Sequence, residues 1–180
     1  MAKQVKDVYG NALFEVAEEE NRIDEFLSEA VAVMKAMDEN TELSIMMTHP
    51  QISDEEKKTV LESIFKGRVY DELYALMDML REKGHFGELD RVLQRFEELV
   101  KEYRHIGVVY VETPMELPDA QKKAVEKKIL ETTDYVSLEM HFAIDPSLIG
   151  GMVVRIGDRV VDSSVRSRLD SLVHVLSAGR

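Results

Sequence analysis

The sequence contains no cysteine and no long apolar run, and each absence excludes a class of protein. Without cysteine there is no disulfide framework, no thiolate nucleophile and no thiolate metal site. No stretch approaches the ~20 apolar residues of a membrane-spanning helix, and the first residues lack the apolar core of a signal peptide. We therefore expect a cytosolic protein, or one attached to a membrane only through partners.

Positive charge is also scarce, with 23 Lys and Arg against 35 Asp and Glu and a formal net charge of −12. A nucleic-acid binder needs a basic surface for phosphates, so no nucleic-acid partner is expected. The excess of acidic residues is unevenly distributed along the chain. Residues 1–105 hold 14 basic and 24 acidic residues, a net charge of −10, whereas residues 106–180 hold 9 and 11, a net charge of −2. This break in charge favours two domains.

The periodicity of apolar residues changes at the same point. Up to residue 105 apolar residues recur every three or four positions, which predicts amphipathic helices. Ser53 with Glu56 predicts a capping box, Pro50 ends a helix, and Gly67 and Gly84 end two others. The expected helices cover about 3–19, 23–37, 43–47, 54–66, 70–83 and 89–103.

From Ile106 the pattern alternates, as in strands. Strands are expected over 108–111, 136–144, 152–156 and 159–161, with a helix starting near Pro118 and another from 165 to about 176. Gly157-Asp158 predicts a two-residue hairpin turn. The predicted fold class is thus α+β: an N-terminal six-helix bundle over 1–105, then a small C-terminal α/β sheet-and-helix domain over 106–180.

Catalytic motifs are absent from the sequence. The five histidines form no metal-binding spacing, so neither a metal nor a cofactor is expected. Asp162, Ser163 and His174 could form a triad, but capping of the last helix explains the first two equally well. Gly150-Gly151 opens onto a strand and not onto a helix, which favours a close backbone approach over a phosphate loop. The sequence therefore predicts a non-catalytic protein.

The first and fifth helices have apolar faces wider than one core contact needs. A small bundle that buries both sides of these helices would explain the width. A groove between them for a partner helix would explain it equally, and Met77 and Met79 suit such an adaptable surface. The pattern alone leaves both interpretations open.

The stretch LIGGMVVRIGDRVVDSSVRSRL, residues 148–169, resembles the C-terminal signature of the delta subunit of F-type ATP synthases, called oligomycin-sensitivity-conferring protein in mitochondria. VYGNALFEVA and THPQISDEEKKTVLESIF resemble N-terminal segments of the same family, from which Gly10 and His85-Phe86 depart. The matching signature residues are Gly150, Gly151, Arg155, Gly157, Asp158, Asp162, Ser164, Val165 and Leu169.

The resemblance implies a structural stator subunit on the cytoplasmic face of the cell membrane. Its N-terminal bundle would bind the N-terminal helix of an alpha subunit of the catalytic head, and its C-terminal domain the b subunits of the peripheral stalk. It would resist rotor torque during proton- or sodium-coupled ATP synthesis. The implied alpha-binding residues are Tyr9 and Ala12, with Leu13, Tyr74 and Met77 added from the apolar pattern. The alternatives are a free helix-binding adaptor or regulator, and a small hydrolase that uses Ser163 or His174.

Overall fold

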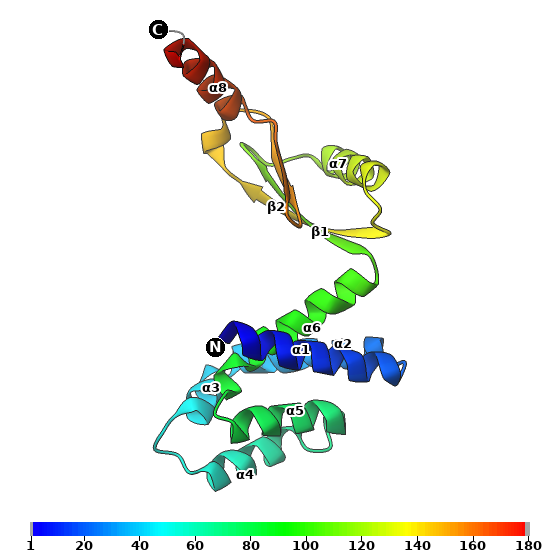
Figure 1. Cartoon of the computed structure of the whole chain (residues 1–180), viewed down its shortest axis with the longest axis vertical. Helices are drawn as coiled ribbons and strands as arrows, with labels where there is room; N and C mark the ends of the chain where they lie inside the picture. The colour runs from blue at the N-terminus through cyan, green and yellow to red at the C-terminus, as the bar shows by residue number, and fades with distance from the viewer. Residues whose placement is uncertain (1, 179–180) are drawn as a thin grey trace. The chain divides into compact units, whose positions relative to one another are not determined.

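The computed structural model describes residues 2–178, and the side chains of residues 4–174. The chain divides into two compact units, Met1–Val100 and Lys101–Arg180, which are described separately below. The first is helical and the second contains a sheet with helices (Figure 1). The predicted α+β fold class is confirmed.

The helical unit begins with α1 (Ala2–Glu19) and runs through six α-helices and one short 3-10 helix. The others are α2 (Ile23–Glu39), α3 (Thr41–Thr48), α4 (Asp54–Phe65), α5 (Asp71–Glu82), η1 (Phe86–Glu88) and α6 (Leu89–Tyr103). Ser53 and Glu56 form the expected capping box at the start of α4. Gly67 and Gly84 follow α4 and α5 with φ of 74° and 68°, which glycine adopts without steric cost.

The apolar faces of the helices meet in one continuous core. Its largest fully buried side chains include Phe26, Leu61, Leu73, Leu93 and Phe96. One charge, that of Arg81 on α5, is buried at the edge of this core. Its guanidinium pairs with Asp54 at the start of α4 and with Asp78, so the buried charge is compensated and fastens α4 to α5.

Gly10 allows α1 to pass close to α6. A Cβ atom at this position would lie 2.8 Å from Cγ of Arg95 and 3.2 Å from the carbonyl oxygen of Val92. Helix propensity alone predicts that glycine weakens α1 by roughly 1 kcal/mol relative to alanine. The structure gives a separate reason for glycine at position 10. A larger residue there would push α1 and α6 apart.

The second unit is built on a four-stranded sheet in the order β2-β1-β3-β4. Its elements are β1 (Ile106–Thr113), α7 (Asp119–Thr132), β2 (Ser137–Ile144), η2 (Pro146–Leu148), β3 (Val153–Ile156), β4 (Arg159–Asp162) and α8 (Val165–Ala178). β1 and β2 are parallel and are joined through α7, whereas β3 pairs antiparallel with β1 and β4. Gly157, with φ of 53°, forms the predicted turn between β3 and β4.

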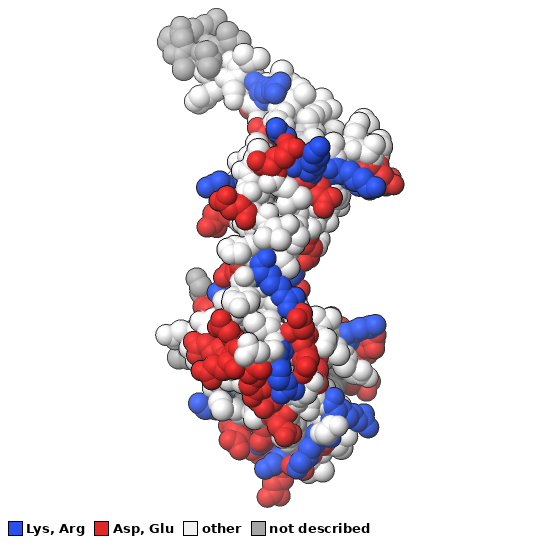
Figure 2. Space-filling model, turned by 90° about the vertical axis from the view of Figure 1, so that its right-hand side faces the viewer, with Lys and Arg blue, Asp and Glu red and all other residues white. Residues whose placement is uncertain are grey.

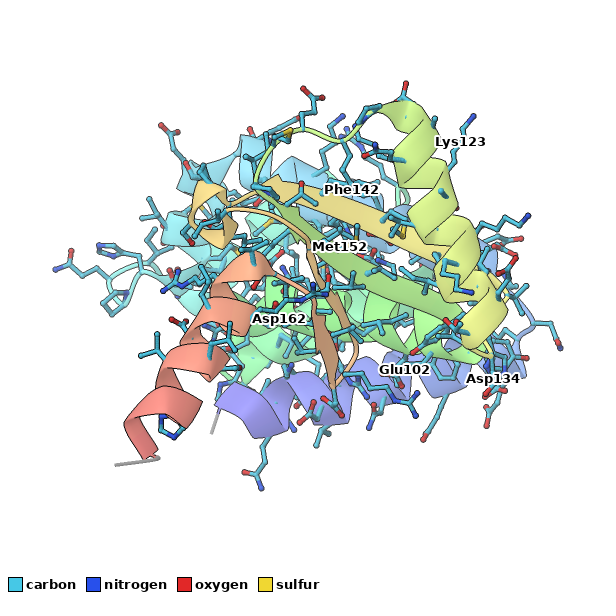
Figure 3. All side chains as sticks on the ribbon, turned by 90° about the horizontal axis from the view of Figure 1, so that it is seen from above. Glu102, Lys123, Asp134, Phe142, Met152 and Asp162 are labelled. Carbon is cyan, nitrogen blue, oxygen red and sulfur yellow. The ribbon has the colours of Figure 1, made fainter. Side chains whose placement is uncertain are left out.

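The two faces of the sheet differ in how well they are covered. Val109 and Val111 of β1 are fully buried on one face. Phe142 of β2 lies near α7, and the Nζ atom of Lys122 is 5.6 Å from its ring centroid (Figure 3). On the other face Tyr110 is 52% exposed and stacks on His141, with ring centroids 4.9 Å apart. The sheet therefore has one covered and one largely open face.

Candidate partner-binding surfaces

An exposed apolar stripe runs along α1. Val8 is 61% exposed, and Ala12, one turn later on the same side of the helix, is also exposed. Tyr9 is half-buried beside them, with the Nζ atom of Lys83 5.9 Å from its ring centroid. Because Lys83 directly follows α5, this contact places Tyr9 beside the end of α5. The stripe thus borders a second helix.

The border on α5 is formed by Met79 and not by Met77. Met79 is 44% exposed and lies one turn before Lys83 on the same side of the helix. Met77 is fully buried, and Leu13 of α1 is 4% exposed, so both belong to the core. In this conformation neither side chain is available to a partner. Val8 and Met79 are exposed, because their angular positions lie outside the buried stripes of α1 and α5.

Tyr74 lies on another side of α5. Five positions separate it from Met79, which corresponds to about 140° around a helix with 3.6 residues per turn. Its hydroxyl is buried without a hydrogen-bond partner. Burial, followed by the charges of Asp78 and of Glu62 on α4, raises the pKa of this hydroxyl. Tyr74 therefore belongs to the side of α5 that faces α4, and the structure does not bring it together with Tyr9 and Ala12.

Acidic residues dominate the surface of the helical unit. Asp and Glu side chains crowd the face of its helices that Figure 2 shows, in line with the net charge of −10 of residues 1–105. An acidic surface favours association with a basic partner.

In the second unit the signature glycines allow two chain segments to touch. Gly151 has a φ of 77°, and a Cβ atom there would lie 2.4 Å from the carbonyl oxygen of Ser163. A Cβ on Gly150 would lie 2.9 Å from Cγ2 of Val165. The backbone N–H of Val165 donates to the carbonyl of Gly150 over 2.9 Å. These glycines thus allow the start of α8 to pack against the segment before β3. This is the close backbone approach that the sequence predicts.

Asp162 and Ser164 hold the first turn of α8. The Ser164 hydroxyl accepts a hydrogen bond from the backbone N–H of Ser167 (3.2 Å). The Asp162 carboxylate accepts from the backbone N–H of Ser164 (2.8 Å) and from the Ser167 hydroxyl. The Ser167 hydroxyl, followed by Ser164, lowers the pKa of Asp162 below its ordinary value of 3.8. Asp162 stands at the junction of β4 and α8 (Figure 3).

The remaining signature residues serve the hairpin and the open face of the sheet. Gly157 and Asp158 form the turn between β3 and β4. Arg155 pairs in register with Tyr110, and together with Glu112 and Val153 these residues line a shallow cleft of about 170 Å³. The signature therefore builds a scaffold, with no arrangement suited to catalysis.

The scaffold presents α8 with its apolar side exposed. Val165, Leu169 and Leu172 occupy one stripe, and Leu172 is 60% exposed. In Figures 1 and 3 this helix points away from the sheet. Around the helix axis, Arg166 lies about 100° from Val165 on one side of the stripe and Arg168 about 60° on the other. Leu176, which the sequence also predicts on this face, lies outside the residues whose side chains the structure describes.

Ile149 extends the same surface in a strained conformation. Its φ is 67°, which is unfavourable for a β-branched residue. The backbone N–H of Gly150 donates to the carbonyl of Leu148 over 2.7 Å, closing a tight γ-turn around Ile149. The side chain is 65% exposed, and the bond between Gly150 and Val165 places it next to the first residue of α8. Such strain is most often retained at functional sites.

The possible catalytic residues do not assemble into a triad. The Ser163 hydroxyl donates to the carbonyl oxygen of Met152 (2.9 Å). His174 lies nine residues beyond Val165, which at 1.5 Å per residue is about 14 Å along α8. Among residues with described side chains, no three His, Asp or Glu side chains are grouped as a metal site would need. Within the described chain, no helix has the length and apolarity to cross a bilayer.

Comparisons with known proteins agree with the resemblance seen in the sequence. Residues 5–176 match the family described as ATP synthase delta (OSCP) subunit. The chain is 42% identical over 172 residues to the ATP synthase subunit delta of Lachnoclostridium phytofermentans, covering 96% of this chain and 94% of that one. It is 35% identical over 164 residues to the ATP synthase subunit delta of Prochlorococcus marinus strain MIT 9303, covering 91% and 90%.

A chain in the cryo-EM structure of the Toxoplasma gondii mitochondrial ATP synthase hexamer has a similar fold. The superposition has a TM-score of 0.73 with 22% sequence identity, and it covers 95% of this chain and 96% of the other. At this identity the similarity supports the fold alone.

Proposed function

Since the chain belongs to the ATP synthase delta (OSCP) subunit family, a non-catalytic subunit of the F-type complex, we propose that it is the stator link of that complex. It joins the N-terminus of an alpha subunit in the catalytic head to the b subunits of the peripheral stalk. The observation that carries this proposal is the presence of an exposed apolar helix face on each of the two units, on α1 and on α8. A link between two bodies needs two separate binding surfaces.

The alpha subunit binds the stripe of α1 and the adjoining edge of α5. Its N-terminal helix packs over Val8 and Ala12 and against Tyr9 and Met79. Ala12 is small, so two helix backbones can approach closely there, and Met79 adapts its shape to the partner. Leu13 and Met77 support this surface from below, because they are core residues. Tyr74 supports α5 from the α4 side.

The b subunits bind the stripe of α8 together with Ile149. Val165, Leu169 and Leu172 provide the apolar contact, and Arg166 and Arg168 favour carboxylates at its edges. Arg166 is already oriented, since one of its Nη atoms donates to the Ser147 hydroxyl over 3.0 Å. The strain at Ile149 fixes an exposed apolar side chain beside the helix before the partner arrives, which lowers the entropic cost of binding.

The function is mechanical. Torque from the rotor acts on the head, and the stator must hold the head still while protons or sodium ions drive ATP synthesis. The contacts with the alpha subunit and with the b subunits must therefore dissociate slowly. Buried apolar area and paired charges slow dissociation. The protein lies at the cytoplasmic face of the cell membrane because its partners hold it there.

Co-purification of the complex with single variants tests this assignment. Ala12→Arg places a charge in the α1 stripe and should release the alpha subunit while the b subunits stay bound. Leu169→Asp does the same to α8 and should release the b subunits while the alpha subunit stays bound. Each loss should exceed the ~1.4 kcal/mol that corresponds to tenfold in affinity. Lys35→Ala, an exposed change on α2, serves as the control.

The alternative of a free helix-binding adaptor predicts a different result. Under that alternative, wild-type protein isolated from native membranes would bring down neither alpha nor b subunits. Retention of both partners by the two folded variants would also reject the surfaces proposed here.

A further inference from the structure

The outer edge of β4 is a border of the sheet that no other strand of the described chain covers. The strand order places β4 at one end of the sheet, and all four of its residues are exposed. Val160 lies on the open face, in register with Arg155, and Val161 lies on the opposite face. Their side chains are 55% and 62% exposed. This edge therefore presents apolar surface to solvent on both of its sides.

The register of the β3–β4 hairpin determines which backbone groups of β4 point outward. Hydrogen-bonded and non-bonded pairs alternate along an antiparallel ladder. The backbone N–H of Ser163 donates to the carbonyl of Met152 over 3.0 Å, so this pair is a bonded one. The next bonded pair contains Val161, whose N–H and C=O groups point toward β3. The N–H and C=O groups of Val160 and Asp162 consequently point away from β3.

These outward groups select the kind of segment that can cover them. Among the described residues, none outside the hairpin donates to or accepts from the backbone of Val160 or Asp162. The two residues are separated by two strand positions, about 7 Å, which is the spacing at which another extended backbone presents its own N–H and C=O groups. A helix could cover the valine side chains, but its backbone groups bond within the helix. The edge is therefore complementary to an extended segment.

The opposite edge of the sheet is less suited to such an addition. On β2, the carboxylate of Glu139 pairs with the Nζ atom of Lys101 (2.7 Å) and contacts the Nε2 atom of His141 (2.8 Å). Charged side chains at an edge disfavour the pairing of a further strand. The middle of β4 carries two valines instead, so β4 is the edge at which a strand can add.

We infer that β4 receives an extended segment of a b subunit, which adds a fifth strand to the sheet. The inference rests on the proposed function, in which the b subunits bind α8. β4 ends at Asp162 and α8 begins at Val165, so the chain between them spans at most ~10 Å. A b subunit held on α8 therefore has a high local concentration beside β4.

The exposed side chains of β4 define the chemistry of the added segment. It carries two adjacent apolar residues, one beside Val160 and one beside Val161, because neighbouring positions of a strand face opposite sides of a sheet. A carboxylate across from Arg159 pairs with its exposed guanidinium. Backbone hydrogen bonds supply affinity in this arrangement, and the alternating side chains supply specificity.

Hydrogen exchange at single-residue resolution tests the inference. The full-length protein is measured alone and in the complex purified with the b subunits. The amides of Val160 and Asp162 should exchange at least about tenfold more slowly in the complex, because they gain hydrogen-bond partners. The amide of Val161 already bonds to β3 and should change less. The alternation distinguishes an added strand from general stabilisation of the hairpin.

A pair of variants tests the outward N–H group directly. Val160→Pro removes this N–H, and proline is tolerated on an edge strand where the N–H faces solvent. Val160→Ile keeps the N–H and the apolar, β-branched side chain. The proline variant should bind the b subunits about tenfold more weakly than the isoleucine variant. Exchange of the Val161 amide in each isolated variant shows whether the hairpin is intact.

The possible outcomes separate the inference from the function on which it rests. If b subunits are present in the complex while the Val160 and Asp162 amides exchange as fast as in the isolated chain, the added strand is overturned and the stator link stands. Equal affinity of the proline and isoleucine variants, with intact hairpins, would overturn the added strand as well. Absence of b subunits from the wild-type complex would reject the proposed function itself.

Discussion

The two units of this protein bury their apolar residues to very different degrees. The helical unit closes around one continuous core that draws side chains from α1 to α6 and from η1. In the sheet unit, the buried apolar side chains among the described residues are Val109, Val111 and Leu148. No described side chain of α7 is buried, and the apolar stripe of α8 is exposed. One unit is packed as an independent domain, whereas the other leaves apolar surface uncovered.

This contrast relates packing to function. Exposed contiguous apolar surface usually marks an interaction site. The helical unit exposes a narrow stripe on α1 over a complete core, so losing its partner should cost it little stability. The sheet unit exposes apolar residues on α8 and on the edge strand β4, where Val160 and Val161 are exposed on both faces. If a partner covers these residues, as proposed for the b subunits, we expect it to contribute directly to the stability of the sheet unit.

The largest expected effect on the free energy of unfolding concerns the packed core of the helical unit. Phe96→Ala removes a fully buried ring from the bundle core and should cost about 3–5 kcal/mol of unfolding free energy. Val161→Ala in β4 changes an exposed side chain and should cost less than about 1 kcal/mol. Chemical denaturation followed by circular dichroism measures both. Similar losses in the two variants would mean that the units do not differ in packing as described.

The next effect separates two glycines of the sheet unit that both have positive φ. Gly151→Ala forces a Cβ atom to within 2.4 Å of the Ser163 carbonyl oxygen, and we expect a loss of about 3 kcal/mol. Gly157→Ala meets nothing within 4 Å, so only the backbone strain remains, about 1 kcal/mol. Hydrogen exchange localises the loss to the sheet unit. A larger loss for Gly157→Ala would contradict the close approach at Gly151.

A smaller effect concerns Gly10 in the helical unit. Propensity predicts that Gly10→Ala stabilises α1 by roughly 1 kcal/mol. The added methyl group would overlap Cβ and Cγ of Arg95 at less than 3.0 Å, and only part of that side chain can move away. We expect the clash to prevail, with a net loss of about 1 kcal/mol. A thermal melt above that of the wild type would show that α1 and α6 have room to separate.

The smallest effect is a pH dependence at the start of α8. The pKa of Asp162 is lowered in the folded protein, so its contribution to stability is present above the ordinary value of 3.8 and is lost as pH falls through the folded pKa. Asp162→Asn should lose this contribution at neutral pH, and wild type and variant should converge at lower pH. Hydrogen exchange of the Ser164 and Ser167 amides between about pH 5 and pH 2 measures the convergence. A constant difference across this range would show that the carboxylate charge plays no part.

Local signals in the sequence predicted most of the fold. Apolar periodicity located all six helices of the bundle, and Ser53, Gly67 and Gly84 marked helix ends because capping and positive φ depend on neighbouring residues alone. Alternation located the strands, and Gly157 predicted the hairpin turn. The residue pattern of the signature indicated the delta subunit family by resemblance. The division at residue 105 and the roles of the two domains remain predictions.

The tertiary structure decided which side of each apolar helix is covered. Met77 and Met79 are equally apolar in the sequence, yet packing buries one and exposes the other, because neighbouring helices fix the rotation of α5. The same holds for Tyr74 on α5 and for the exposed stripe of α8. Periodicity shows that a helix has an apolar face, but only packing against distant segments determines whether that face becomes core or binding surface.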